Sequence, residues 1–215
     1  MEVRRTLNEK DINRISVLCF LGAIYFGICL VKLLIVPHIK APVIVFDESR
    51  YFSIAYQIWH NHTFIEQLPF SQYPPLYPLI LSPVSVLDTV YDQYYCSLII
   101  NVFLSTSVIF PVFFLAYEYL NSNKYSLAVS GLIGIAPPFF LYTFTLMAEN
   151  LYFVLFASSV LFMKRVWNKN NFSNNLVAGV LISLAVLTKL IGLCLVVVYI
   201  GEKIWQKIEK YRCSI

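Results

Sequence analysis

The chain has 215 residues, of which 59% are hydrophobic and 13% are charged, and its formal net charge is +4. Soluble domains carry about 25% charged residues, so this composition excludes an ordinary soluble domain, a disordered chain and a disulfide scaffold. The positive charges lie beside apolar runs and not in a basic patch, which argues against a nucleic-acid partner. We therefore expect an all-α polytopic membrane protein, in which each spanning helix takes about 20 residues.

The first expected membrane segment covers residues 15–36 and follows a cytoplasmic N-terminus, residues 1–14, that contains four Lys and Arg. This segment is uncharged until Lys32, whose ammonium group we expect to snorkel to the membrane surface. Further segments are predicted at residues 95–117, 125–146 and 147–163 from their continuous apolar sequence. The positive-inside rule then places the basic linker that follows residue 163 in the cytoplasm.

Between the first two segments lies one long loop, residues 38–94, which we expect to be extracytoplasmic and to carry amphipathic or interfacial helices. Its second half is uncharged over about 20 residues, long enough to span a membrane. Five prolines there argue against a regular spanning helix, because each removes a backbone donor and clashes with the preceding turn. We therefore interpret this half as interfacial or re-entrant.

The last apolar stretch, residues 176–201, is interrupted by Lys189. As a single span it would bury this lysine near the middle of the membrane, which is costly. As a hairpin of two short helices it would turn at Lys189 on the outer side and return the tail, residues 206–215, to the cytoplasm. The hairpin agrees better with the positive-inside rule and gives about six membrane helices in total.

This topology brings four rare charged residues to the extracytoplasmic side: Asp47, Glu48, Glu149 and Lys189. Carboxylates suit general-base catalysis, and a lysine suits a phosphate group as a point charge. Simpler interpretations remain open. The two adjacent acids could be a solvated pair, Glu149 could be a helix-start charge, and Lys189 could simply pair with Glu149.

Four short motifs, taken in order, resemble the GT-C superfamily of membrane glycosyltransferases, near the dolichyl-phosphate-mannose protein mannosyltransferases and the lipid A aminoarabinose transferases. The resemblance covers most of residues 1–205, with residues 15–205 as the transmembrane module. The motifs are Asp47-Glu48-Ser49-Arg50-Tyr51, Tyr73-Pro74-Pro75-Leu76-Tyr77-Pro78, Met147-Ala148-Glu149-Asn150-Leu151 and Leu187-Thr188-Lys189.

The resemblance implies transfer of a sugar from a polyprenyl-phosphate carrier to a protein, lipid or glycan hydroxyl on the extracytoplasmic face. It makes Asp47 the base that deprotonates the acceptor and Glu48 the residue that orients the acceptor or the sugar. Lys189, together with Arg50, would hold the lipid phosphate. Glu149 would line the sugar pocket or order the first loop.

The same resemblance adds Tyr51 and Tyr73 to the expected substrate-binding residues. It implies no cofactor besides the donor lipid, and we assign no metal ligands. The expected location is the plasma membrane, or the endoplasmic reticulum membrane in a eukaryote.

Members of the superfamily are usually longer, so we expect this chain to correspond to their N-terminal module, and a second membrane chain could supply the missing helices. Two alternatives remain: a non-catalytic accessory or assembly subunit, and a small transporter.

Overall fold

The computed structural model describes residues 2–61 and 73–212, and within these ranges it contains helices and no strand. Residue 1, residues 62–72 of the expected loop and residues 213–215 of the expected tail lie outside the described ranges. The all-α prediction is therefore confirmed. The α-helices are α1 (Glu2–Ile35), α2 (Val45–Asn61), α3 (Leu76–Leu81), α4 (Val90–Thr106), α5 (Ile109–Leu120), α6 (Asn123–Ile135), α7 (Pro137–Leu141), α8 (Glu149–Asn168), α9 (Phe172–Thr188) and α10 (Leu193–Arg212). Four short 3-10 helices connect them: η1 (Val36–His38), η2 (Ser82–Val86), η3 (Tyr142–Phe144) and η4 (Leu190–Gly192).

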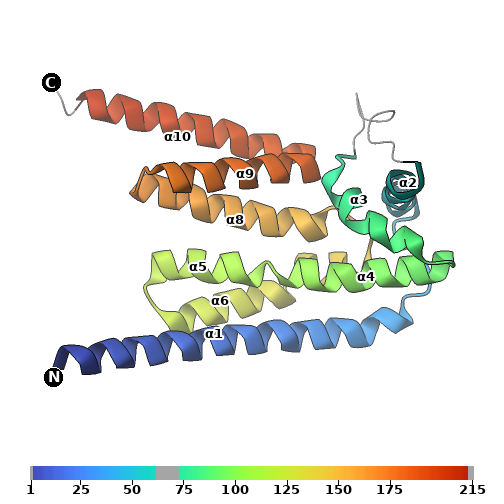
Figure 1. Cartoon of the computed structure of the whole chain (residues 1–215), viewed down its shortest axis with the longest axis horizontal. Helices are drawn as coiled ribbons and strands as arrows, with labels where there is room; N and C mark the ends of the chain where they lie inside the picture. The colour runs from blue at the N-terminus through green and yellow to red at the C-terminus, as the bar shows by residue number, and fades with distance from the viewer. Residues whose placement is uncertain (1, 62–72, 213–215) are drawn as a thin grey trace.

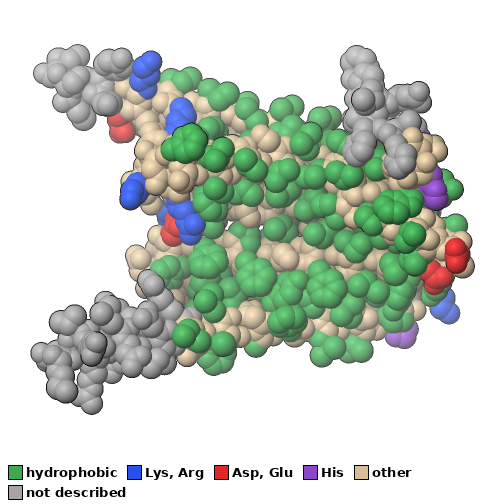
Figure 2. Space-filling view, viewed as in Figure 1, with side chains coloured by type: hydrophobic (Ala, Val, Ile, Leu, Met, Phe, Trp, Pro, Cys, Tyr) green, Lys and Arg blue, Asp and Glu red, His purple; other side chains and the backbone are tan. Residues whose placement is uncertain are grey.

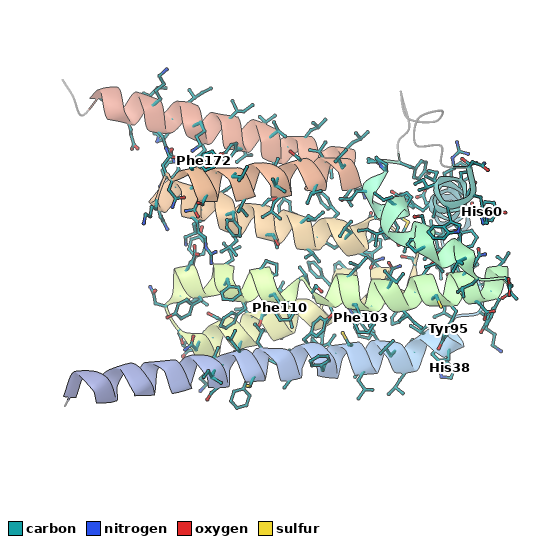
Figure 3. The ribbon with its side chains drawn as sticks, viewed as in Figure 1. His38, His60, Tyr95, Phe103, Phe110 and Phe172 are labelled. Carbon is teal, nitrogen blue, oxygen red and sulfur yellow. The ribbon has the colours of Figure 1, made fainter. Side chains whose placement is uncertain are left out.

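The long helices lie roughly side by side, and both ends of the chain lie at the same end of the molecule (Figure 1). In the view of Figure 1, α1 is at the bottom, α8, α9 and α10 are at the top, and α4, α5 and α6 lie between them. The loop helices α2 and α3 cover the end opposite the termini. Figure 3 marks the two ends, with His38, His60 and Tyr95 near the loop helices and Phe172 at the end of the termini.

Two helical stretches of the described chain, Ile15–His38 and Val90–Leu120, are long and apolar enough to cross a membrane. A third is added if Asn123–Ile135 and Pro137–Phe144, which meet at 54°, form one bent span. The bend follows from Pro137 and Pro138, because proline cannot continue the hydrogen-bonded ladder of α6. These stretches make the structure compatible with a membrane protein.

Local sequence signals explain where several helices begin and end. Thr89 caps α4, with its hydroxyl accepting from the backbone N–H of Asp92 at 3.0 Å. Asn171 caps α9 in the same way, accepting from the backbone N–H of Asn174 at 2.8 Å. Asn121 ends α5 in the left-handed conformation, with φ of 49°, which asparagine tolerates better than most residues. The caps satisfy backbone groups that a helix end otherwise leaves unpaired.

The chain turns at Lys189, and α9 and α10 then run antiparallel to each other (Figure 1). Helix α9 has 17 residues and α10 has 20, so each is longer than the part of the apolar stretch 176–201 that lies on its side of Lys189. The turn passes so close to α9 that it requires glycine at position 192. A Cβ there would lie 2.8 Å from the carbonyl carbon of Ala185. A larger residue would push the turn away from the end of α9.

The expectation that Lys32 snorkels to the surface is wrong. Its side chain is completely buried and its ammonium donates to Ser105 Oγ at 3.0 Å, Thr106 Oγ1 at 3.2 Å and the Phe139 carbonyl at 3.1 Å. The position on α1 faces α4 and α7, where two hydroxyl groups and the Phe139 carbonyl offer acceptors. Three hydrogen bonds inside the bundle replace contact with water.

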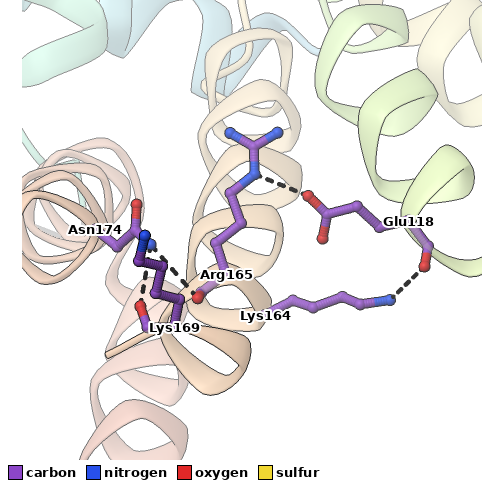
Figure 4. Close-up of polar contacts among 5 residues, drawn as sticks. All are labelled: Glu118, Lys164, Arg165, Lys169 and Asn174. Carbon is purple, nitrogen blue, oxygen red and sulfur yellow. Dashed lines mark hydrogen bonds and ion pairs between the residues drawn. The ribbon is translucent and has the colours of Figure 1, made fainter. Parts of the chain in front are cut away.

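Charged side chains gather at the two ends of the molecule. On the face shown in Figure 2, Lys and Arg lie mainly at the end of the termini, and a broad apolar belt separates them from acidic and His side chains at the opposite end. At the terminal end Arg165 pairs with Glu118 at 2.8 Å and Lys164 donates to the Glu118 carbonyl at 3.2 Å, which joins α8 to α5 (Figure 4).

Candidate functional site

Asp47 lies in the first turn of α2, and its carboxylate accepts a hydrogen bond of 2.5 Å from the Tyr73 hydroxyl. The bond joins the start of α2 to the segment that leads into α3. It also raises the pKa of the Tyr73 phenol, because the carboxylate prefers the protonated donor, whereas the nearby Arg50 acts in the opposite direction. Tyr73 therefore holds one carboxylate oxygen of Asp47.

Tyr51 is buried one helical turn after Asp47 and lies at the centre of an aromatic group. Its ring meets Tyr73 edge-on with centroids 5.0 Å apart, and meets Tyr77 in the same manner at 5.2 Å. Burial raises the pKa of Tyr51, and the charges of Glu149 and Asp47 raise it further.

Glu149 is the first residue of α8, and its Oε1 atom forms an ion pair with the Lys189 ammonium at the turn between α9 and α10. The glutamate side chain is 11% exposed and the lysine side chain 37%. Oε2 of Glu149 is buried and has no hydrogen-bond partner among the described residues. Because an ammonium carries three donors, Lys189 keeps hydrogen-bonding capacity beyond this pair.

Glu48 differs from its neighbour Asp47. It is 1% exposed, and its Oε1 atom accepts from the backbone N–H groups of Val43 and Ile44, at 2.8 and 2.7 Å. Its Oε2 atom accepts from the Tyr94 hydroxyl at 3.0 Å and from the backbone N–H of Leu146 at 2.9 Å. These four donors tie Glu48 to the chain just before α2, to α4 and to the segment just before α8. We interpret Glu48 as a positioning residue, because its four hydrogen bonds hold these segments together.

The structure brings most of the predicted site residues together at the end opposite the termini. Asp47, Tyr73 and Tyr51 form one connected group. The start of α8 packs in the same buried cluster as Tyr51, which brings the Glu149–Lys189 pair to this end of the molecule. Arg50 is exposed, and its charge acts on Tyr73. Among the described residues, no group of three or more His, Cys, Asp or Glu side chains could hold a metal ion.

The sequence analysis missed a polar stripe along α4. Gln93, Ser97, Asn101 and Ser105 recur every four residues, and all four are buried. Asn101 accepts from the Tyr77 hydroxyl at 2.9 Å and donates to the Thr145 carbonyl at 2.9 Å, and Ser105 contacts Lys32. The spacing of four in an apolar helix was the available signal, because it places these side chains on one face.

Chemically, the site combines one hydrogen-bonded carboxylate, one ion-paired carboxylate with a free oxygen, and one partly exposed ammonium. A hydroxyl substrate could donate to either carboxylate, and an anionic leaving group could bind the ammonium.

Comparisons with protein-family models, with curated proteins and with solved structures found no match for the chain. The resemblance to the GT-C superfamily therefore remains a prediction from the motifs.

Proposed function

We propose that this chain is a membrane glycosyltransferase, or the N-terminal module of one, that transfers a sugar from a polyprenyl-phosphate carrier to a protein, lipid or glycan hydroxyl. The observation that carries the proposal is the shared neighbourhood of Tyr51. Tyr73 holds Asp47 and meets the Tyr51 ring edge-on. Tyr51 belongs to the same buried cluster as Ala148 and Leu151, which flank Glu149, and Glu149 is paired with the cation Lys189. This arrangement supports the proposal that a base and a phosphate-binding cation share one site.

In the proposed reaction, Asp47 takes the proton of the acceptor hydroxyl, and the hydroxyl oxygen attacks the anomeric carbon of the sugar. The bond from that carbon to the carrier phosphate breaks, and its electron pair goes to the phosphate oxygen. Lys189 stabilises the departing phosphate, because preorganised charge at the site of developing charge lowers the barrier. A single displacement of this kind inverts the anomeric configuration.

The other residues take supporting parts in the proposal. Tyr73 orients the Asp47 carboxylate, so that its second oxygen can reach the acceptor. The unpartnered Oε2 atom of Glu149 is suited to accept from a sugar hydroxyl, because a buried acceptor without a donor is costly. Arg50 adds positive charge at the exposed edge of the site.

We further propose six membrane passes: α1, α4 with α5, α6 with α7, α8, α9 and α10. With 17 residues, α9 is about 26 Å long, close to the hydrocarbon thickness of about 30 Å. The termini then lie in the cytoplasm and the Asp47 site faces the opposite compartment. A cysteine in place of Leu190, in a chain without its native cysteines, should react with an impermeant thiol reagent from outside. Labelling only from the cytoplasm contradicts this topology.

The functional test is sugar transfer by membranes that contain Asp47→Asn, supplied with labelled polyprenyl-phosphate sugars. General-base catalysis contributes about 10²–10⁴-fold, so we expect transfer to fall by at least about a hundredfold. Asp88→Asn is the matched control, because Asp88 is exposed and outside the site. Transfer by Asp47→Asn at the wild-type rate would remove the proposed base.

The transporter alternative has one observation in its favour, the buried Lys32 between α1, α4 and α7. An intramembrane charge is a common feature of transport pathways. Its three hydrogen bonds to uncharged groups fit a structural role better. Substrate uptake into liposomes that is lost in Lys32→Met and retained in Asp47→Asn would favour transport over sugar transfer.

A further inference from the structure

A cavity lies at the same end of the molecule as the Asp47 site and is formed mainly by α2, the chain before it and the start of α4. Its volume is about 380 Å³. It shares none of its lining residues with the Asp47–Tyr73–Tyr51 group or with the Glu149–Lys189 pair. The lining residues are Lys40, Pro42, Glu48, Ser49, Phe52, Val90, Tyr91, Tyr94 and Leu146.

Three of the nine residues that line this cavity are aromatic. Phe52 comes from α2, and Tyr91 and Tyr94 come from the first turns of α4, so the rings reach the cavity from two helices. The faces of aromatic rings carry negative electrostatic potential and attract cations, and groups of such rings recognise quaternary ammonium ions. The composition of the lining therefore suits an organic cation.

Glu48 supplies the negative charge that such a cation needs. It is almost completely buried and lines the cavity, yet no Lys, Arg or His among the described residues forms an ion pair with it. A buried carboxylate without a counter-ion is unfavourable even when it is hydrogen-bonded, so a bound cation would stabilise it.

The hydrogen bonds of Glu48 also select the kind of cation. Two donors already occupy each of its oxygens. A primary ammonium would compete with these donors for lone pairs. A trimethylammonium group has no N–H and needs only the charge and the ring faces, so it fits the cavity without displacing any of the four bonds.

Lys40 is exposed and also lines the cavity, where it offers a point charge to an anion. A cation site next to an ammonium matches a zwitterion that carries both charges a few bonds apart. We propose that the cavity binds the phosphocholine headgroup of a membrane phospholipid, with the choline between Phe52, Tyr91 and Tyr94 beside Glu48 and the phosphate at Lys40. Binding would fix the start of α2, and Asp47 with it, at the membrane surface.

The test is a titration of the purified full chain in detergent with short-chain phosphatidylcholine and, separately, with phosphatidylglycerol of the same acyl chains, followed by native mass spectrometry. We expect phosphatidylcholine to bind at least about fivefold more tightly, and free phosphocholine to compete with it. Equal binding of the two lipids, or tighter binding of phosphatidylglycerol, would overturn the proposal, and this comparison requires no variant.

Two variants locate the site. Phe52→Leu and Tyr91→Leu remove one ring each and keep an apolar side chain, so each should weaken phosphatidylcholine binding about fivefold and leave phosphatidylglycerol binding unchanged. Phe46→Leu is the matched control, because Phe46 lies on α2, is 77% exposed and does not line the cavity. Unchanged phosphatidylcholine binding in both ring variants, or an equal loss in the control, would contradict the assignment.

Discussion

Neutral substitution of the adjacent acids Asp47 and Glu48 should change the free energy of unfolding by very different amounts. In Glu48→Gln an amide nitrogen replaces one oxygen and cannot accept, so the two donors that face it lose their acceptor. A hydrogen bond to a charged group contributes about 1.5–3 kcal/mol, so the free energy of unfolding should fall by about 3–6 kcal/mol. In Asp47→Asn the Tyr73 hydroxyl keeps an oxygen to donate to, and we expect a change below about 1 kcal/mol.

The assay is thermal unfolding of the two purified variants in the same detergent, followed by circular dichroism. For a chain of this size about 1 kcal/mol shifts the midpoint by roughly 2–4 °C, so Glu48→Gln should unfold at least about 6 °C below the wild type. Asp47→Asn should unfold within about 4 °C of it. Equal midpoints for the two variants would refute the interpretation of Glu48 as a positioning residue.

Three further predictions concern stability. Gly192→Ala should lower the free energy of unfolding by about 1–3 kcal/mol, because its Cβ would meet the backbone of Ala185, whereas Gly179→Ala, with open space, should not destabilise in the same melting assay. Lys32→Ala should cost about 2–4 kcal/mol in a denaturant titration, because it leaves a cavity and removes three hydrogen bonds, and an unchanged midpoint would contradict its buried position. Arg165→Ala should cost only about 1 kcal/mol, because the pair with Glu118 is partly exposed, and a double-mutant cycle with Glu118→Ala should give a coupling of that size.

Sequence reasoning could predict the helical class and the break at Lys189. Both depend on features that are local in sequence, namely long apolar runs and the cost of a charge within one of them. The same argument failed at Lys32, because the partners of this lysine lie 73 to 107 residues away on α4 and α7. A single helix does not reveal which neighbour its polar residue will face.

The site residues show the same division. The motifs placed Asp47, Tyr73, Glu149 and Lys189 in one group, and the structure brings them to the end of the molecule opposite the termini. They gave Asp47 and Glu48 different roles, but they did not show how the two side chains differ in burial and hydrogen bonding, although adjacent positions on a helix point about 100° apart. Two of the four donors to Glu48 are the local backbone N–H groups of Val43 and Ile44. The other two come from the distant residues Tyr94 and Leu146, and only the tertiary structure shows them.

Donor binding tests the central claim most directly, because it needs no knowledge of the acceptor. Binding of polyprenyl phosphate to the purified chain should be weakened about tenfold in Lys189→Met, which removes the cation at the leaving group, and should be unchanged in Asp47→Asn. This division of roles is what a base and a phosphate-binding cation in one transferase site predict. Wild-type affinity in Lys189→Met would contradict the proposed site.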